Sequence, residues 1–81
     1  MADYQEVLAR VKKVTAEVLR AEVTEITEKS TFSGHLGAES IDSIKLVAAF
    51  DEEFDIEMEE SEAVQVQSVG KAAEFIMRYL D

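Results

Sequence analysis

Apolar residues recur at helical spacing in three stretches of the chain, and this periodicity restricts the possible folds more than any other feature. Within residues 4–19, 40–54 and 69–80 they follow the i, i+3, i+4, i+7 pattern of an amphipathic helix. The alternation of polar and apolar residues at 55–58 is too short for an independent strand, and no longer strand pattern appears. Since the chain contains no proline to interrupt a helix, the sequence predicts an all-α fold.

The segments between these helices differ in character. Residues 21–36 have no helical period and contain several turn-forming residues, so we expect a long loop with at most one short turn. The apolar residues expected to anchor this loop are Ile26, Phe32 and Leu36. Residues 60–66 are long enough for about two helical turns. The expected architecture is a small four-helix bundle of three longer helices and one short helix, with a long loop after the first helix, in a single domain over residues 1–81.

The second of these helices begins at a serine that follows a glycine-containing loop. Ser40 stands where an N-cap is expected, and Asp42 places a negative charge in the first turn. A hydroxyl at this position lies next to backbone N–H groups that have no partner inside the helix, and such groups bind phosphate well. We therefore expect Ser40 to be both the N-cap of the helix and the attachment point of a prosthetic group, through a phosphate ester.

The chain is strongly acidic, with 18 acidic and 8 basic residues and a formal net charge of −10. Such a charge repels nucleic acid and anionic membranes and attracts partners with basic patches, although it is equally consistent with a role in solubility alone. No apolar run approaches the roughly 20 residues that a membrane span requires, and no signal peptide is recognisable. We expect a cytoplasmic protein that neither binds nucleic acid nor inserts into a membrane.

The side chains needed for common catalytic and metal sites are missing. Cysteine is absent, which excludes thiol chemistry, disulfides and cysteine-based metal sites. The only histidine is His35, a loop residue before Ser40; it could approach the serine, but no oxyanion-binding nest or rigid scaffold is evident for nucleophilic catalysis. The acidic residues at 51–57 lack the ligand spacing and the central glycine of a calcium-binding loop. We expect His35 to be a surface residue, and the protein to be neither an enzyme nor a metal-binding protein.

The second helix has two apolar faces. One has the spacing of a core-facing stripe and consists of Leu46, Ala49, Phe50 and Phe54. The other includes two isoleucines near the start of the helix and consists of Ile41, Ile44, Lys45, Ala48 and Glu52. Either the helix is buried on two sides, or this second face is a docking surface or a wall beside the group attached to Ser40.

The sequence around Ser40 resembles that of the acyl carrier proteins. The family signature is Leu-Gly-Ala/Met-Asp-Ser-Leu-Asp, followed by an acidic helix that ends in Glu-Glu-Phe. The matching residues are Phe32, Leu36-Gly37-Ala38-Glu39-Ser40-Ile41-Asp42-Ser43-Ile44, Leu46-Val47 and Phe50-Asp51-Glu52-Glu53-Phe54-Asp55-Ile56-Glu57. The resemblance extends over the whole chain: a first helix, a long loop, an acidic second helix, a short third helix and a last helix starting at Ser68-Val69-Gly70.

The resemblance implies a carrier and not a catalyst. A phosphopantetheinyl transferase would attach phosphopantetheine from coenzyme A to Ser40, with Glu39 and Ile41 as the flanking motif. The arm would hold acyl groups as thioesters and present them to acyl-transferring, condensing or acyl-loading enzymes with basic docking patches, in fatty-acid or related lipid or secondary-metabolite biosynthesis. The residues expected to recognise partners are Ile41, Ile44, Lys45, Ala48, Asp51 and Glu52. Those expected to line an apolar cleft for the acyl chain are Leu46, Phe50, Ile76 and Leu80.

Several positions depart from the family pattern. The usual Asp-Ser-Leu is Glu39-Ser40-Ile41 here, and His35 replaces a common acidic residue. Lys45 stands where ordinary fatty-acid carriers have an acidic residue. Either it is an incidental helix residue that pairs with Glu52, with Glu53 or with nothing, or it disfavours the usual basic partners and, together with His35, marks a specialised carrier for a dedicated pathway.

The alternative to a carrier is an unmodified interaction module with a carrier-like fold. The serine argues against it, because a plain helix cap is served equally well by Asp or Asn. No large apolar surface is expected beyond Ile41 and Ile44, so we expect a monomer.

Overall fold

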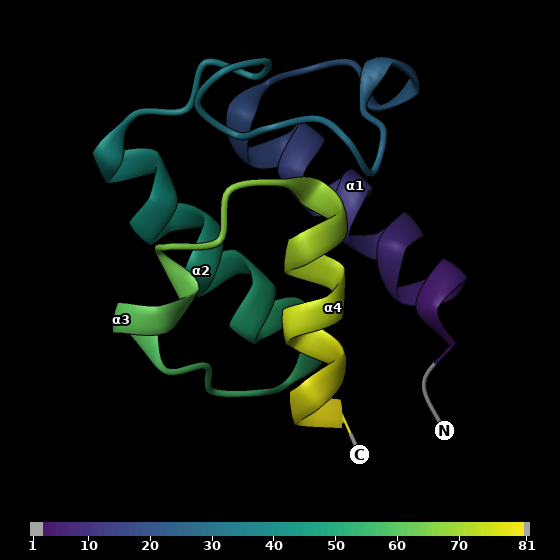
Figure 1. Cartoon of the computed structure of the whole chain (residues 1–81), viewed down its shortest axis with the longest axis vertical. Coiled ribbons are helices and arrows are strands. Elements are labelled where there is room, and N and C mark those ends of the chain that lie inside the picture. The colour runs from purple at the N-terminus through teal and green to yellow at the C-terminus, as the bar shows by residue number, and fades with distance from the viewer. Residues whose placement is uncertain (1–2, 81) are drawn as a thin grey trace.

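The computed structural model describes residues 3–80 (Figure 1). In chain order, its elements are α1 (Tyr4–Leu19), a short 3-10 helix η1 (Val23–Glu25), α2 (Ser40–Phe54), α3 (Glu60–Ala63) and α4 (Val69–Leu80). In this part of the chain the regular structure is all helical, apart from one isolated bridge between Thr31 and Ser68. The predicted bundle of three longer helices and one short helix is confirmed.

The first helix buries one face along most of its length. Asp3 is its N-cap, and the Asp3 carboxylate accepts the backbone N–H of Gln5 at 3.3 Å. The buried stripe has the predicted helical spacing and consists of Val7, Leu8, Val11, Val14 and Thr15. Because α1 packs against both α2 and α4, this stripe forms the centre of the core.

The last helix supplies the opposite side of the core. The hydroxyl of Ser68 accepts the backbone N–H of Lys71 at 3.3 Å, as expected for an N-cap. The buried residues of α4 are Val69, Gly70, Ala72, Ala73, Phe75 and Ile76. The apolar residues at helical spacing in 69–80 are Val69, Ala72, Ala73, Ile76 and Leu80. All of them are buried except Leu80, which is only half-buried at the end of the helix.

The long loop after α1 is fixed to the start of α4, and Figure 1 shows it passing over one end of the bundle. Ile26 and Phe32 are buried and Leu36 packs half-buried against the core, so the predicted anchors are confirmed. Three backbone hydrogen bonds join the loop to α4 and the segment before it: Phe32 N–H to the Gln67 carbonyl (2.9 Å), Val69 N–H to the Ser30 carbonyl (2.9 Å) and Gly70 N–H to the Glu28 carbonyl (2.8 Å). The loop is therefore an ordered part of the fold.

Gly70 allows α4 to approach this loop. A Cβ atom at position 70 would lie 2.9 Å from the carbonyl oxygen of Glu28, which is closer than van der Waals contact. Tyr4 adds a side-chain link, because its hydroxyl donates to Glu28 Oε2 at 3.1 Å. Desolvation and the Glu28 carboxylate raise the pKa of the Tyr4 phenol.

Arg10 joins α1 to the end of α2. Its Nε lies 2.8 Å from Glu53 Oε2, its Nη2 donates to the Glu53 carbonyl at 2.6 Å, and its guanidinium lies 4.3 Å from the centroid of the Phe54 ring. Glu53 is therefore bound to α1 and not to Lys45. Within residues 3–80, Lys45 forms no ion pair, so of the alternatives for its helix partner it pairs with neither Glu52 nor Glu53.

The third helix is shorter than expected. It comprises only Glu60–Ala63, whereas the sequence favours a helix over 60–66. After Val64 the backbone hydrogen bonds run from residue i to residue i−3: Gln65 N–H donates to the Glu62 carbonyl at 3.1 Å and Val66 N–H to the Ala63 carbonyl at 3.1 Å. The chain thus tightens into a 3-10 turn and leaves the α-helix. The segment 64–68 that follows connects α3 to α4.

Candidate functional site

The second helix is capped one residue earlier than expected. Its N-cap is Glu39, and Ser40 is its first residue, so the prediction that Ser40 is the N-cap is wrong. The backbone N–H of Glu39 donates to Asp42 Oδ2 at 2.9 Å, and the Glu39 carbonyl accepts the N–H of Asp42 at 2.9 Å. Because the Asp42 side chain reaches back to the residue before the serine, the cap moves from Ser40 to Glu39.

Because Glu39 is the N-cap, the Ser40 hydroxyl is not needed to cap α2. The residue is exposed, and within residues 3–80 its hydroxyl makes no hydrogen bond. The backbone N–H groups of Ser40 and Ile41 likewise find no acceptor in this part of the chain. They lie at the positive end of the α2 dipole, where a phosphate is favoured. The residues at this helix start therefore fit a phosphate ester on the Ser40 hydroxyl.

A compact turn holds the segment before Ser40. The N–H of Thr31 donates to His35 Nδ1 at 2.9 Å, and the N–H of His35 donates to Thr31 Oγ1 at 3.1 Å. Gly37 then adopts φ 70°, in the left-handed region that suits glycine, and the Ala38 N–H donates to the Phe32 carbonyl at 2.7 Å. His35 is exposed as predicted, but its ring stabilises the turn, a role that the sequence reading missed.

Most residues predicted to recognise partners form one exposed face of α2. This face consists of Ile41, Ile44, Lys45, Ala48 and Glu52. Ile41 is 59% exposed and Ile44 is 53% exposed, so burial of the helix on two sides is excluded. Two large apolar side chains therefore stand in solvent within one turn of Ser40.

Asp51 differs from the other predicted recognition residues. It is only partly exposed, and its Oδ1 accepts the backbone N–H of Met58 at 3.0 Å. The Asp51 carbonyl also accepts the N–H of Ile56 at 3.0 Å. Asp51 therefore fixes the segment after α2, and only part of its carboxylate is left for a partner.

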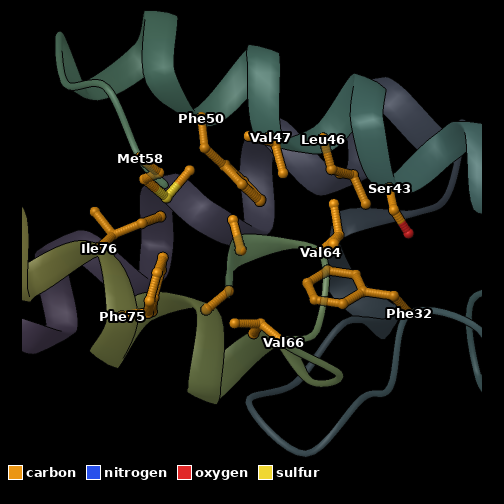
Figure 2. Close-up of a pocket in the computed structure, with 12 residues that line it drawn as sticks. Phe32, Ser43, Leu46, Val47, Phe50, Met58, Val64, Val66, Phe75 and Ile76 are labelled. Atoms are coloured by element: carbon orange, nitrogen blue, oxygen red, sulfur yellow. The ribbon is translucent and has the colours of Figure 1, made fainter. Parts of the chain in front are cut away.

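An apolar cavity lies between α2, the α3 region and α4 (Figure 2). Leu46, Phe50 and Ile76 line it, as expected for a cleft, but Leu80 does not. The cavity meets α4 only at Ala72, Phe75 and Ile76. Leu80 lies about one turn beyond these residues, toward the C-terminal end of the helix.

Several cavity residues were not predicted from the sequence. They are Phe32, Ser43, Val47, Met58, Ala63, Val64, Val66, Ala72 and Phe75. Some come from the loop and from the connections around α3, where no periodicity indicates a direction. The space open to the centres of water-sized spheres is about 30 Å³. One ordered water needs roughly 10–15 Å³ on this measure, so the cavity is too small to hold a hydrocarbon chain without rearrangement.

Comparison with known proteins identifies the family. A family model described as "Phosphopantetheine attachment site" matches residues 9–76. An acyl carrier protein of Phenylobacterium zucineum is 47% identical over 75 residues, covering 93% of this chain and 95% of the relative. The chain belongs to the acyl carrier proteins. An acyl carrier protein of Caulobacter vibrioides is 46% identical over 71 residues, covering 88% of this chain and 91% of the relative.

Membership of the acyl carrier proteins defines the general activity. The protein carries acyl groups on phosphopantetheine and is not itself an enzyme. It works with a phosphopantetheinyl transferase and with acyl-handling enzymes. Over residues 3–80, no group of three or more His, Cys, Asp or Glu residues is placed to hold a metal ion. None of the helices described is both long and apolar enough to cross a membrane.

Proposed function

We propose that Ser40 is the attachment point of the phosphopantetheine arm. The observation that carries this proposal is the free hydroxyl of Ser40 at the first residue of α2, next to two backbone N–H groups without acceptors. The ester phosphate would accept hydrogen bonds from Ser40 and Ile41, and the helix dipole would stabilise its charge. When bound, the arm supplies the thiol that carries the acyl group, which the cysteine-free chain lacks.

The exposed face of α2 is the proposed docking surface for partner enzymes. Ile41 and Ile44 offer two apolar contacts close to the attachment point, and Glu52 offers a carboxylate to a basic patch. Lys45 is exposed and is the only basic residue of α2. A preferred partner would therefore place a carboxylate opposite Lys45. Such a partner would make this a specialised carrier.

The apolar cavity is the proposed shelter for the acyl chain. Leu46, Phe50 and Ile76 line it together with Phe75 and Met58, which gives the apolar lining that a hydrocarbon needs. Since the space is too small for a hydrocarbon chain, loading must separate the α3 region from α2. α3 has only four residues and is the shortest α-helix described, so it has the least helical structure to disturb.

Intact mass spectrometry tests the attachment point. The chain is incubated with coenzyme A, magnesium and a broad-specificity phosphopantetheinyl transferase. Wild type is expected to gain one phosphopantetheine, and Ser40→Ala is expected to gain none. Ser61→Ala is the matched control, because Ser61 is an exposed serine on α3, and it is expected to be loaded like wild type.

Two results would contradict the proposal. Loading of Ser40→Ala would show that another residue is modified. No loading of wild type by several transferases would favour the unmodified interaction module.

Two further expectations are tested separately. Size-exclusion chromatography with light scattering tests the expected monomer, and cell fractionation tests the expected cytoplasmic location.

A further inference from the structure

His35 is a hydrogen-bond acceptor in the turn that precedes Ser40. The backbone N–H of Thr31 donates to His35 Nδ1 at 2.9 Å, and the Thr31 hydroxyl lies 3.3 Å from the same nitrogen. Within residues 3–80, the Thr31 N–H has no other acceptor. Because a protonated nitrogen cannot accept a hydrogen bond, this contact requires the neutral ring with its proton on Nε2.

The contact between His35 and Thr31 belongs to the structure that leads to the attachment point. Thr31 is followed by Phe32, whose side chain is buried in the core. The Phe32 carbonyl accepts the N–H of Ala38 at 2.7 Å, and Ala38 stands two residues before Ser40. The ring of His35 therefore helps to fix the turn from which the chain enters α2.

Three charged side chains line an open pocket together with His35. They are Glu22, Glu25 and Lys29, and within residues 3–80 none of them forms an ion pair. About 370 Å³ of this pocket is open to the centres of water-sized spheres, so a ring that leaves Thr31 has room to turn. An imidazolium is attracted by the two carboxylates and repelled by the ammonium of Lys29, which favours the side of the pocket formed by Glu22 and Glu25.

We propose that His35 is a pH-dependent positioning residue for Ser40. The neutral ring holds Thr31 and fixes the turn, whereas the protonated ring releases Thr31 and turns toward Glu22 and Glu25. The acidic residue usual at this position would offer carboxylate acceptors throughout the physiological range, but an imidazole gains its proton between about pH 5 and pH 8. The turn is therefore fixed at the upper end of this range and loosens as the pH falls.

Two variants test the release of Thr31. In His35→Asn, Oδ1 replaces Nδ1 as an acceptor bonded to Cγ and does not titrate, while His35→Ala has no acceptor at any pH. Hydrogen exchange of the Thr31 N–H, corrected for its intrinsic rate, is measured at about pH 5 and about pH 8, the limits of imidazole titration. Wild type should match His35→Asn at the higher pH and His35→Ala at the lower, with protection about two- to tenfold weaker once the hydrogen bond is lost.

The ring itself provides a second readout. Since His35 is the only histidine of the chain, nitrogen NMR of its ring requires no assignment among several imidazoles. The neutral ring is expected to carry its proton on Nε2. A proton on Nδ1 in the neutral ring would overturn the proposal. Protection of the wild-type Thr31 N–H that stays equal to that of His35→Asn at both pH values would overturn it as well.

The rate of loading tests the positioning of Ser40, and this part rests on the proposed attachment there. Wild type and His35→Asn are loaded by the same transferase at both pH values, so that the ratio of their kcat/KM values removes the pH dependence of the transferase. The ratio of wild type to His35→Asn should be near one at the higher pH and fall about two- to tenfold at the lower, through KM, because the competent turn is less populated.

The outcomes separate the two proposals. A ratio that stays constant with pH would overturn the positioning role of His35 while leaving attachment intact. Failure of wild type to load at either pH would instead overturn the attachment to Ser40, and the exchange and NMR measurements on the unloaded chain would still decide whether His35 releases Thr31.

Discussion

α2 and α4 are both rich in apolar residues, but they place them differently. In α4, Val69 is fully buried and Ile76 is 1% exposed. In α2, Phe50 is buried in the core, whereas Ile41 and Ile44 remain largely in solvent. Full burial of such a side chain stabilises a fold by about 1.5–3 kcal/mol. Ile41 and Ile44 are mostly exposed, so they contribute little of this stabilisation. α4 therefore serves packing, while α2 divides its apolar residues between the core and a surface beside Ser40.

The starts of the two helices differ in the same way. At the start of α4, the N–H groups of Val69 and Gly70 donate to the first loop, and that of Lys71 donates to Ser68. At the start of α2, the N–H groups of Ser40 and Ile41 have no acceptor within residues 3–80. One helix start is closed by the fold, and the other is left available for a ligand.

The largest expected effect comes from truncating one isoleucine in each helix. Ile76→Ala removes a buried side chain from α4 and is expected to lower the free energy of unfolding by about 2–5 kcal/mol. Ile44→Ala makes the same change on the exposed face of α2 and is expected to change it by no more than about 0.5 kcal/mol. Urea denaturation of both variants measures the difference. Equal losses would show that the exposed face of α2 contributes to the core.

The next largest effect is expected at the start of α4, where Gly70 packs against the first loop. In Gly70→Ala, the new Cβ meets the Glu28 carbonyl oxygen, and the loop or the helix must move. A loss of about 1–3 kcal/mol is expected, as for other overpacked sites. Thermal unfolding measures the loss. An unchanged or higher melting temperature would mean that the junction yields and that the loop is less firmly fixed than its hydrogen bonds indicate.

The long helices and their inner faces could be predicted from the sequence because helical periodicity is local. A stripe such as Val7, Val11 and Val14 indicates both the helix and the side that it buries before any partner is known. The long loop could be predicted for the same reason, from the lack of a period and from the spaced apolar anchors Ile26 and Phe32.

What could not be predicted depends on three-dimensional contacts or on competition between neighbouring residues. Ser40 has the better intrinsic preference for an N-cap, but the reach of Asp42 back to Glu39 decides the boundary. Leu80 continues the inner face of α4, yet the height of the cavity along the helix favours Phe75 instead. The exposure of Ile41 and Ile44 could be stated only as one of two alternatives, because periodicity does not show which apolar face meets the core.

Capping of α2 gives a third and smaller contrast. Asp42→Ala removes the acceptor for the Glu39 N–H and is expected to cost about 0.5–2 kcal/mol. Ser40→Ala removes a hydroxyl without a hydrogen bond and is expected to change stability by no more than about 0.5 kcal/mol, while abolishing loading. Thermal unfolding of the two unloaded variants ranks them. A larger loss of stability in Ser40→Ala would show that the serine hydroxyl caps α2. It would contradict the finding that this hydroxyl makes no hydrogen bond.

The smallest expected effect concerns Lys45 and partner choice. Lys45→Glu reverses an exposed charge without an ion pair, so stability should change by no more than about 0.5 kcal/mol. Loading by a transferase with a basic docking patch is expected to become about 1.5- to 5-fold faster at low salt, the factor that an exposed charge pair of about 0.2–1 kcal/mol produces. The gain should disappear at high salt, because exposed charges are screened. Lys71→Glu on α4 makes the same change in net charge away from the exposed face of α2. If both variants accelerate loading equally, the effect comes from net charge alone, and the role proposed for Lys45 in partner choice is wrong.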